Sequence, residues 1–362
     1  MHPLLLEFDY NDRPHLYQLY AGLSKLAKKN VVLLKVGTNS NYKHSILKIK
    51  VNKKVNVVFD TLDGFNWIDG TIEDNLKYFQ TNFSNTNYYF KRSYNELLDK
   101  FAPKNCQVFP LGLNYLVYPS EPIIEPPLIE KVKYYLKKNK LLNNFISFNT
   151  NAHNSEIFEF FPNINQSIKI LFLTRLWNPD DVKDDRIKFE RDNININRIR
   201  YIKICKEEFG ELFTGGVVED DFSKSFAPNF CISHEMSKRN NFLKLIREHQ
   251  ICIATTGLHD SIGWKFGEYV AAARGIISEP IKYTLPGNFL KQENYLEFSN
   301  DINLINNIYY LQKNQDYLQQ MMMSNMQYYN NYVKPENLVF NALLKISLKE
   351  TKISHINKKK VI

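Results

Sequence analysis

The sequence has few cysteines, and their placement excludes two common kinds of stabilised scaffold. In 362 residues there are only four, Cys106, Cys205, Cys231 and Cys252. No two of them form a CxxC pair and none lies in a cluster with histidine, so neither a zinc site nor a disulfide framework is indicated. We expect reduced thiols that pack as small buried hydrophobic side chains in a reducing compartment.

Long apolar runs are also absent. No stretch has the roughly 20 uncharged apolar residues that a membrane-spanning helix requires. The opening residues, MHPLLLEFDYNDRP, have no basic segment, and their apolar run is only Leu4–Leu6, so no secretory signal is visible. We therefore expect a cytoplasmic protein.

Composition and charge limit the number of domains and the kinds of partner that the protein can have. The chain is 44% hydrophobic and 14% aromatic, enough to bury a core, and its length predicts about two domains. Lys and Arg exceed Asp and Glu by 47 to 38, a net charge of +9, which favours phosphate-bearing partners or an anionic membrane surface. The basic residues are dispersed and match no nucleic-acid-binding motif, so we expect no nucleic-acid partner.

Short apolar runs in the first half predict strands separated by helices or loops. The predicted strands are Leu4–Phe8, Val31–Gly37, Val55–Asp60 and Val108–Tyr115. The second and third are nearly continuous, as is typical of strands buried on both faces of a parallel sheet. The proline-rich segment Pro119–Pro127 predicts a rigid surface connection, and KVKYYLKKNKLL after it has helical spacing.

The second half repeats the alternation. Strands are predicted at Ser167–Thr174, in ELFTGGV and at Gln250–Gly257, and helices at 196–209 and 237–248. This pattern predicts an α/β fold of two doubly wound, Rossmann-like domains. We place a first domain at residues 1–165, a second at 166–335, and a C-terminal amphipathic helix, NLVFNALLKISL, with a basic tail at 336–362.

The segment most informative about chemistry is ATTGLHDSIGWKFGEYVAAARGIISEP. Its layout predicts a strand, a loop, a helix that opens near Gly263, and a second strand from Gly275. Lys265 and Glu268 are three residues apart, so both project on one face near the start of this helix. Free N–H groups and the helix dipole there would stabilise a diphosphate, with the lysine on phosphates and the glutamate on ribose hydroxyls.

The same segment resembles the donor-binding motif of group-1 glycosyltransferases of the GT-B architecture. Asp260 and Glu268, separated by seven residues, bracket the loop and helix start, and the small-residue turn AAARG follows. The family usually has Glu in place of Asp260. Arg175, in LFLTRLW, stands where the family has an arginine that contacts the diphosphate. The resemblance covers about residues 169–335.

The resemblance implies two domains facing each other across a cleft that binds a UDP- or GDP-sugar. It implies transfer of the sugar to a hydroxyl of a glycan or lipid-linked acceptor, as in bacterial surface polysaccharide or lipopolysaccharide assembly, with no required cofactor or metal. The residues expected to bind the donor are Arg175, Gly257, Asp260, Lys265 and Glu268. Net charge and the Lys-rich tail would hold the enzyme at the inner face of the plasma membrane.

Three residues are candidates for catalysis. Asp60 follows a predicted strand and would act as a general base if it lay within about 3 Å of an acceptor hydroxyl. Asp9 is a similar candidate, and His259 would donate to a sugar hydroxyl or phosphate. Lys91 and Arg92, in FKRSY, are candidate contacts for a charged acceptor or a lipid phosphate.

Simpler interpretations stay open for most of these residues. Asp260 would serve equally as a helix N-cap, and Lys265 with Glu268 as an exposed ion pair. Asp63 and Gly64 are as consistent with a plain turn as with a site. Two other functions also fit: a sugar-nucleotide epimerase of similar architecture, and a catalytically silent protein that binds a nucleotide or glycan.

Overall fold

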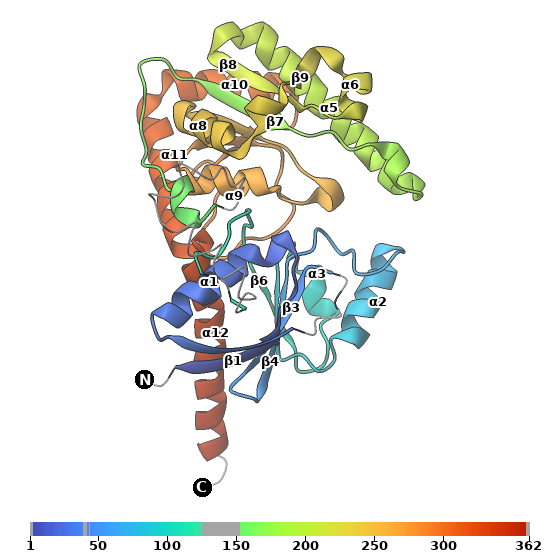
Figure 1. Cartoon of the computed structure of the whole chain (residues 1–362), viewed down its shortest axis with the longest axis vertical. Helices are drawn as coiled ribbons and strands as arrows, with labels where there is room; N and C mark the ends of the chain where they lie inside the picture. The colour runs from blue at the N-terminus through green and yellow to red at the C-terminus, as the bar shows by residue number, and fades with distance from the viewer. Residues whose placement is uncertain (1–2, 39–41, 43, 122, 125–152, 360–362) are drawn as a thin grey trace, which may run out of the picture.

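The computed structural model folds into two α/β units, one above the other in Figure 1. It describes residues 3–38, 42, 44–121, 123–124 and 153–359, with side chains up to Leu348. The predicted helix in KVKYYLKKNKLL and the end of the proline-rich segment before it lie outside the described residues.

The N-terminal unit is built on a six-stranded mixed sheet. Its strands are β1 (Leu4–Asp9), β2 (Val32–Gly37), β3 (Ile46–Val51), β4 (Val55–Asp60), β5 (Tyr88–Lys91) and β6 (Gln107–Pro110), in the order β2-β1-β3-β4-β5-β6. All neighbours are parallel except β3, which is antiparallel to both β1 and β4. The link between β2 and β3 is too short for the crossover helix that a parallel connection requires.

Four strands were predicted in this half, and all four are present. The last is shorter than predicted, because β6 ends at Pro110. Burial of both faces was wrong for the second strand: β2 is an edge strand on which Leu33 and Lys35 are exposed. The sequence prediction missed β3 and β5.

Helices cover the two faces of this sheet. On one face α1 (Tyr17–Lys28) and α12 (Pro335–Lys359) share a hydrophobic core with β1 to β5. On the other face α2 (Ile72–Asn82) and α3 (Leu97–Lys100) pack against β3 to β6. The second face is open over β2 and β1, which is why the alternate residues of β2 are exposed.

The C-terminal unit has a fully parallel sheet in the order β12-β11-β10-β7-β8-β9. The strands are β7 (Ile170–Thr174), β8 (Phe213–Val218), β9 (Cys231–Ile232), β10 (Ile251–Ala254), β11 (Gly275–Ser278) and β12 (Leu296–Glu297). Helices α5 (Asp185–Phe209) and α10 (Asp301–Lys313) pack on one face, and α8 (Arg239–Glu248) and α9 (Trp264–Ala271) on the other. The remaining helices are α6 (Asp221–Phe226), α7 (His234–Ser237) and α11 (Gln315–Tyr328).

The strands and helices predicted in this half are confirmed, with one large difference in length. The helix predicted at 196–209 is the second part of α5, which begins eleven residues earlier. Asp184 is the N-cap, and its side chain accepts a hydrogen bond from the Arg186 N–H. Its first turns lack a continuous apolar stripe, and Phe189 is 69% exposed there. Hydrophobic periodicity therefore gave no signal for them.

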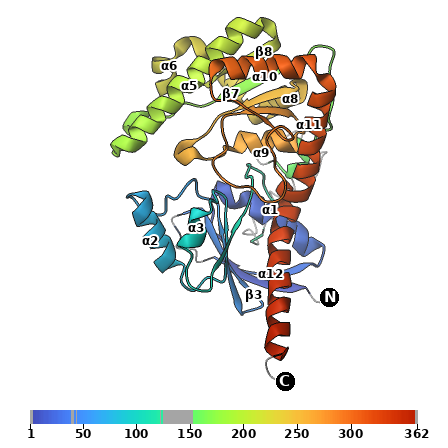
Figure 2. The same ribbon diagram turned by 180° about the vertical axis from the view of Figure 1, so that it is seen from behind.

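The predicted C-terminal helix is α12, and it returns to the N-terminal unit. Figure 2 shows α12 running from the upper unit down along the lower one. Its buried residues Leu338, Val339, Ala342, Leu343 and Ile346 complete the core under α1. The N-terminal core therefore combines the two ends of the chain.

The carboxyl edges of the two sheets face each other. The ring of His15, which follows β1, packs in a tilted arrangement against Trp264 at the start of α9, with ring centroids 4.6 Å apart. Arg92, which follows β5, donates a hydrogen bond to the carbonyl oxygen of Ile262, which precedes α9. The predicted fold class, two Rossmann-like α/β units that face each other in the GT-B manner, is confirmed.

The predicted boundary at residues 163–166 stays a prediction. Leu113, Tyr115 and Val117, which follow β6, share a core cluster with α9 of the C-terminal unit, and Phe158 belongs to the same cluster. Contacts between the units therefore begin well before the predicted boundary.

Two other expectations concern the cysteines and the membrane. All four cysteines are free; Cys205 and Cys252 are buried as predicted, while Cys106 and Cys231 are half-buried. Within the described residues, no helix combines the length and the apolar character needed to cross a bilayer.

Close packing of α1 on α12 gives a test of this architecture. A Cβ at Gly22 would overlap the Pro335 carbonyl and contact the side chain of Val339. We expect Gly22→Ala to lower the free energy of unfolding by about 1–3 kcal/mol, the usual cost of overpacking, measured by chemical denaturation. Lys29→Ala, at the exposed end of α1, is the control. Equal stability of the Gly22 variant and wild type would contradict the packing.

Candidate active site

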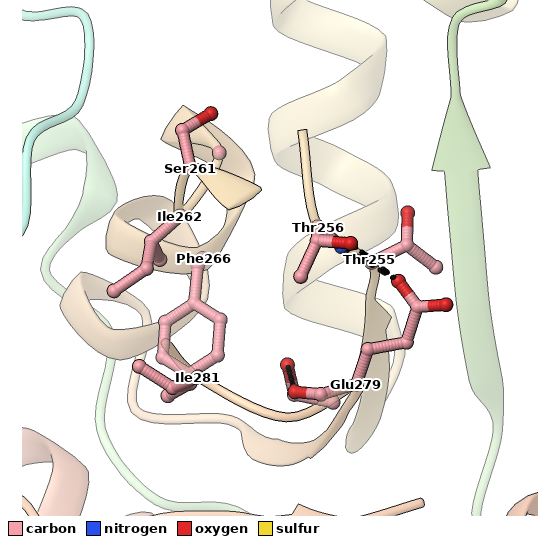
Figure 3. Close-up of a pocket in the computed structure, with 9 residues that line it drawn as sticks. Thr255, Thr256, Ser261, Ile262, Phe266, Glu279 and Ile281 are labelled. Atoms are coloured by element: carbon pink, nitrogen blue, oxygen red, sulfur yellow. Dashed lines mark hydrogen bonds between the residues drawn. The ribbon is translucent and has the colours of Figure 1, made fainter. Parts of the chain in front are cut away.

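A small pocket lies where the carboxyl ends of β10 and β11 meet the start of α9 (Figure 3). On one side the backbone N–H and the hydroxyl of Thr256 donate to Glu279 Oε2, at 2.8 and 3.0 Å. On the other side Phe266, Ile262 and Ile281 form an apolar wall. The pocket therefore sits at the edge of a parallel sheet where α/β proteins bind ligands.

The loop that leads into α9, residues 256–262, is tightly folded; we call it the entry loop. Thr256 and Ile262 form a β-bridge, and the Gly257 N–H donates to the Ser261 carbonyl at 2.8 Å. A Cβ at Gly257 would lie 2.7 Å from Ser261 Oγ, which explains the glycine. His259 and Asp260 both have left-handed backbone, with φ of 58° and 56°.

The alternative that Asp260 is the N-cap of α9 is wrong. The N-cap is Gly263, and no side chain caps the helix. Asp260 is exposed at the tip of the entry loop. The N–H groups in the first turn of α9 therefore have no side-chain acceptor, and a buried donor beside them, Trp264 Nε1, has no partner within the described residues.

Four cations surround this helix end. Lys265 is half-buried, and its amine lies over the ring of Phe242, 3.9 Å from the ring centroid. Burial lowers the pKa of Lys265 to about 8; Glu268 opposes this change, and the positive charges of Arg239, Arg175 and Arg198 add to it. The arrangement concentrates positive charge where a helix dipole already favours an anion.

Glu268 is buried rather than surface-paired. It is 2% exposed, and its Oε1 forms an ion pair with Arg239 Nη1 at 2.6 Å. Its Oε2 is buried and has no hydrogen-bond partner within the described residues. Because a carboxylate oxygen without a donor is costly to bury, this atom is a candidate acceptor for a ligand hydroxyl. The alternative of an exposed Lys265–Glu268 pair is wrong.

Arg198 fixes the floor of the site. It is 7% exposed and donates to the carbonyls of Arg175, at 2.7 Å, and Thr256, at 3.0 Å. Burial lowers its pKa to about 10. Arg198 therefore joins the ends of β7 and β10. Arg175 directly follows β7 and is exposed.

The structure argues against Asp60 as a general base. Asp60 is completely buried, and its carboxylate accepts hydrogen bonds from Trp67 Nε1, Tyr89 Oη, Lys91 Nζ and the Leu62 N–H. No acceptor hydroxyl can reach a carboxylate that is filled in this way. Asp60 instead fixes the loop that follows β4.

The basic residues at the end of β5 likewise have their charged groups paired within the protein. Lys91 is fully buried against Asp60, with the two charged atoms 3.1 Å apart. Arg92 is 5% exposed, pairs with Asp63 at 2.7 Å and donates to Ile262 O. Neither side chain is placed to contact an acceptor or a lipid phosphate.

Two catalytic candidates remain at the interface. Asp9 is exposed at the carboxyl end of β1. His259 lies opposite Gly64 of the N-terminal unit; its N–H donates to Glu190, and its carbonyl accepts from Tyr283 Oη at 2.7 Å. These contacts hold the backbone of His259 and leave its ring available.

Sequence reasoning missed three residues around the start of α9: Glu279, which lines the pocket, and Arg198 and Arg239, which lie near Lys265 without lining the pocket. Glu279 directly follows the strand from Gly275, so its position at a carboxyl edge was a usable signal. Arg198 and Arg239 lie within helices and match no local motif. Only the packing of those helices on the sheet brings them to the site.

Comparisons with known proteins give structural matches only. No protein-family model and no curated protein sequence matches the chain. WaaG, a glycosyltransferase involved in lipopolysaccharide biosynthesis, matches at 10% identity and a TM-score of 0.42, over 92% of this chain and 97% of that one. Sucrose-phosphate synthase from Thermosynechococcus elongatus matches at 11% and 0.42, over 82% and 67%. The C-terminal domain of LpcC, a group-1 family glycosyl transferase from Francisella tularensis, matches at 11% and 0.35, over 50% and 97%.

The lowered pKa of Lys265 is directly measurable. We expect one signal in an NMR titration of ¹³C-dimethylated lysines to have a midpoint near pH 8, and to vanish in Lys265→Met. The folded chain favours the neutral amine, so between pH 8 and pH 10.5, the ordinary pKa of lysine, the unfolded chain binds more protons than the folded one. The free energy of unfolding should therefore rise with pH across this range. Titration of every lysine at about pH 10.4 would contradict the burial.

Proposed function

We propose that the protein is a glycosyltransferase that moves a sugar from a nucleotide-diphospho-sugar to a hydroxyl of a glycan or lipid-linked acceptor. The donor is a UDP- or GDP-sugar, and the transfer requires no metal. The reaction takes place between the two units, with the donor on the C-terminal side and the acceptor on the N-terminal side.

The observation that carries this proposal is the unpaired, buried Oε2 of Glu268 beside an uncapped helix start and a cluster of cations. An uncapped N-terminus alone would attract any anion. A buried carboxylate oxygen among cations adds a requirement for a hydroxyl donor close to that anion. A nucleoside diphosphate has both groups, the pyrophosphate and the pentose hydroxyls.

The residues present have distinct roles in this reaction. The first-turn N–H groups of α9, with Arg175 and Lys265, stabilise the negative charge that develops on the departing diphosphate. Glu268 accepts hydrogen bonds from the pentose. Asp260 and His259, in the entry loop, are proposed to contact the sugar, and Asp9 and His259 are the candidates that remain for proton transfer. Asp60 has no role in the chemistry.

Nucleotide binding tests the site. We expect UDP or GDP to raise the melting temperature of the wild type, since a ligand at 100 times its Kd stabilises by about 2.7 kcal/mol. Glu268→Gln and Arg175→Ala should each weaken binding by a factor of about ten to a hundred, the range for hydrogen bonds to charged groups, measured by isothermal titration calorimetry. Both should raise the KM for the donor sugar.

Glu293→Gln, at an exposed position away from the site, is the matched control and should bind the nucleotide as the wild type does. Unchanged affinity in both site variants would remove the assignment. Products distinguish the alternatives: an epimerised sugar nucleotide without acceptor dependence indicates an epimerase, and tight nucleotide binding without turnover indicates a silent binding protein. A transfer rate that EDTA abolishes would contradict metal independence.

The positive charge is concentrated on the N-terminal unit. Residues 1–60 contain ten Lys or Arg and four Asp or Glu, residues 335–362 contain six and two, and the other 274 residues contain 31 and 32. The two basic segments pack together through α1 and α12. We propose that this unit is held electrostatically at an anionic membrane, where a lipid-linked acceptor would be found.

The proposed membrane contact is tested with vesicles. Lys50, Lys53 and Lys54 are exposed at and beside the turn between β3 and β4. We expect the protein to co-sediment with phosphatidylglycerol vesicles, less so at higher salt, and the triple change of these lysines to Glu to remove most of the binding, since each lysine near an anionic surface contributes about 1 kcal/mol.

Changing Lys203, Lys206 and Lys244 to Glu alters the net charge equally on the C-terminal unit. This control should bind vesicles nearly as the wild type does. Equal losses in the two triple variants would show that only the net charge matters, and no binding to anionic vesicles by wild type would end the proposal.

A further inference from the structure

The entry loop is held on several sides by its own unit. Arg198 donates to the carbonyl of Thr256 at 3.0 Å. Glu190, from the first part of α5, accepts from the His259 N–H, and Tyr283 Oη donates to the His259 carbonyl at 2.7 Å. Together with the β-bridge between Thr256 and Ile262, these contacts hold the loop within its own unit. Its end, next to α9, has one further contact, which comes from the other unit.

That end is held from the N-terminal unit. The Arg92 guanidinium donates through Nη2 to the carbonyl of Ile262, the residue before the N-cap of α9, and through Nη1 to Asp63 Oδ1 at 2.7 Å. Both Arg92 and Asp63 follow strands of the N-terminal sheet, β5 and β4. The contact therefore spans the interface between the two sheets.

The chemistry of arginine suits this contact. A guanidinium has five N–H donors in a fixed fork, so it satisfies a carboxylate and a carbonyl at the same time; a lysine has a point charge and lacks that geometry. Arg92 is 5% exposed, so its hydrogen bonds are shielded from water. If the units separated, both Arg92 and the Ile262 carbonyl would be hydrated again.

We infer that Arg92 is a positioning residue that sets the end of the entry loop when the two units come together, and so prepares the start of α9 for the donor. This inference rests on the proposed function for its ligand, a nucleoside diphosphate. Its structural part, the control of the loop by a residue of the other unit, stands without any ligand. Asp63 acts with Arg92 by holding the guanidinium toward Ile262.

The structural part is tested by hydrogen exchange of the full chain without ligand. In Arg92→Ala, the amides of Gly257 and Ser261, which close the entry loop, should exchange about tenfold faster or more, while those of β10 stay protected. Arg92→Lys should give an intermediate rate. Arg186→Ala is the matched control, because Arg186 also donates across the interface, to the Gly70 carbonyl, without touching the entry loop.

The functional part is tested with UDP and GDP as probes. We expect Arg92→Ala to raise the Kd of the nucleotide that binds wild type about tenfold, and to raise the donor KM more than it lowers kcat. Arg92→Gln, which keeps part of the donor geometry, should recover some affinity. A melting temperature near that of the wild type shows that a variant is folded. If Arg92→Ala does not fold, Arg92→Gln replaces it in the binding and kinetic measurements.

The two proposals fail in different ways. Faster loop exchange in Arg92→Ala, with no nucleotide binding by wild type, would support the positioning role and refute the proposed donor site. Nucleotide binding by wild type, with loop exchange and affinity unchanged in folded Arg92 variants, would overturn the positioning role and leave the donor site intact.

Discussion

The candidate site depends on the repulsion among like charges gathered around the first turn of α9. Lys265 lies within electrostatic range of Arg175, Arg198 and Arg239. Of these charges Arg198 is buried and has lost most of its hydration, Lys265 and Arg239 are half-buried, and Arg175 is exposed. Glu268 compensates part of this by pairing with Arg239, yet one of its own oxygens has no partner. A fold does not hold such an arrangement for stability alone, because apolar side chains of similar volume would fill the space at lower cost. An anion bound there, as proposed above for the donor, would relieve the repulsion among these cations.

The N-terminal unit uses buried charge in the opposite way. The carboxylate of Asp60 accepts four hydrogen bonds, and Lys91 donates two, to Asp60 and to the Leu62 carbonyl, so both oxygens of Asp60 are fully paired. This pairing makes the loops after β4 and β5 rigid, and these loops hold Asp63 and Arg92. The paired carboxylate of Asp60 therefore holds the loops on one side of the interface, opposite the incompletely paired Glu268 on the other side.

Sequence reasoning identified the fold and one part of the site, for a physical reason. Strands such as β4 and β7 are short continuous apolar runs, and the entry loop and α9 are contiguous in sequence, so local pattern was sufficient to place them. β3 was missed although the alternation of its apolar residues with lysines is typical of a half-buried strand, because the prediction relied on continuous apolar runs. β2 was taken for a central strand because composition does not show which strand is at the edge. Asp60 and Arg92 were misjudged because their sequence positions are those of site residues, and only packing shows that their charges are already used. Arg198 and Arg239 reach the site from separate helices, which no local pattern reveals.

The return of α12 to the first sheet has a consequence for how the protein is made. Residues of α12 between Leu338 and Ile346 form part of the hydrophobic core beneath α1. Until α12 has been synthesised, the N-terminal unit therefore lacks these side chains, and part of its core is uncovered. Domains usually fold in the order of their synthesis. Here the first unit to emerge has to wait, with apolar surface exposed, for the last helix, so its stability and that of the following unit become part of a single folding event.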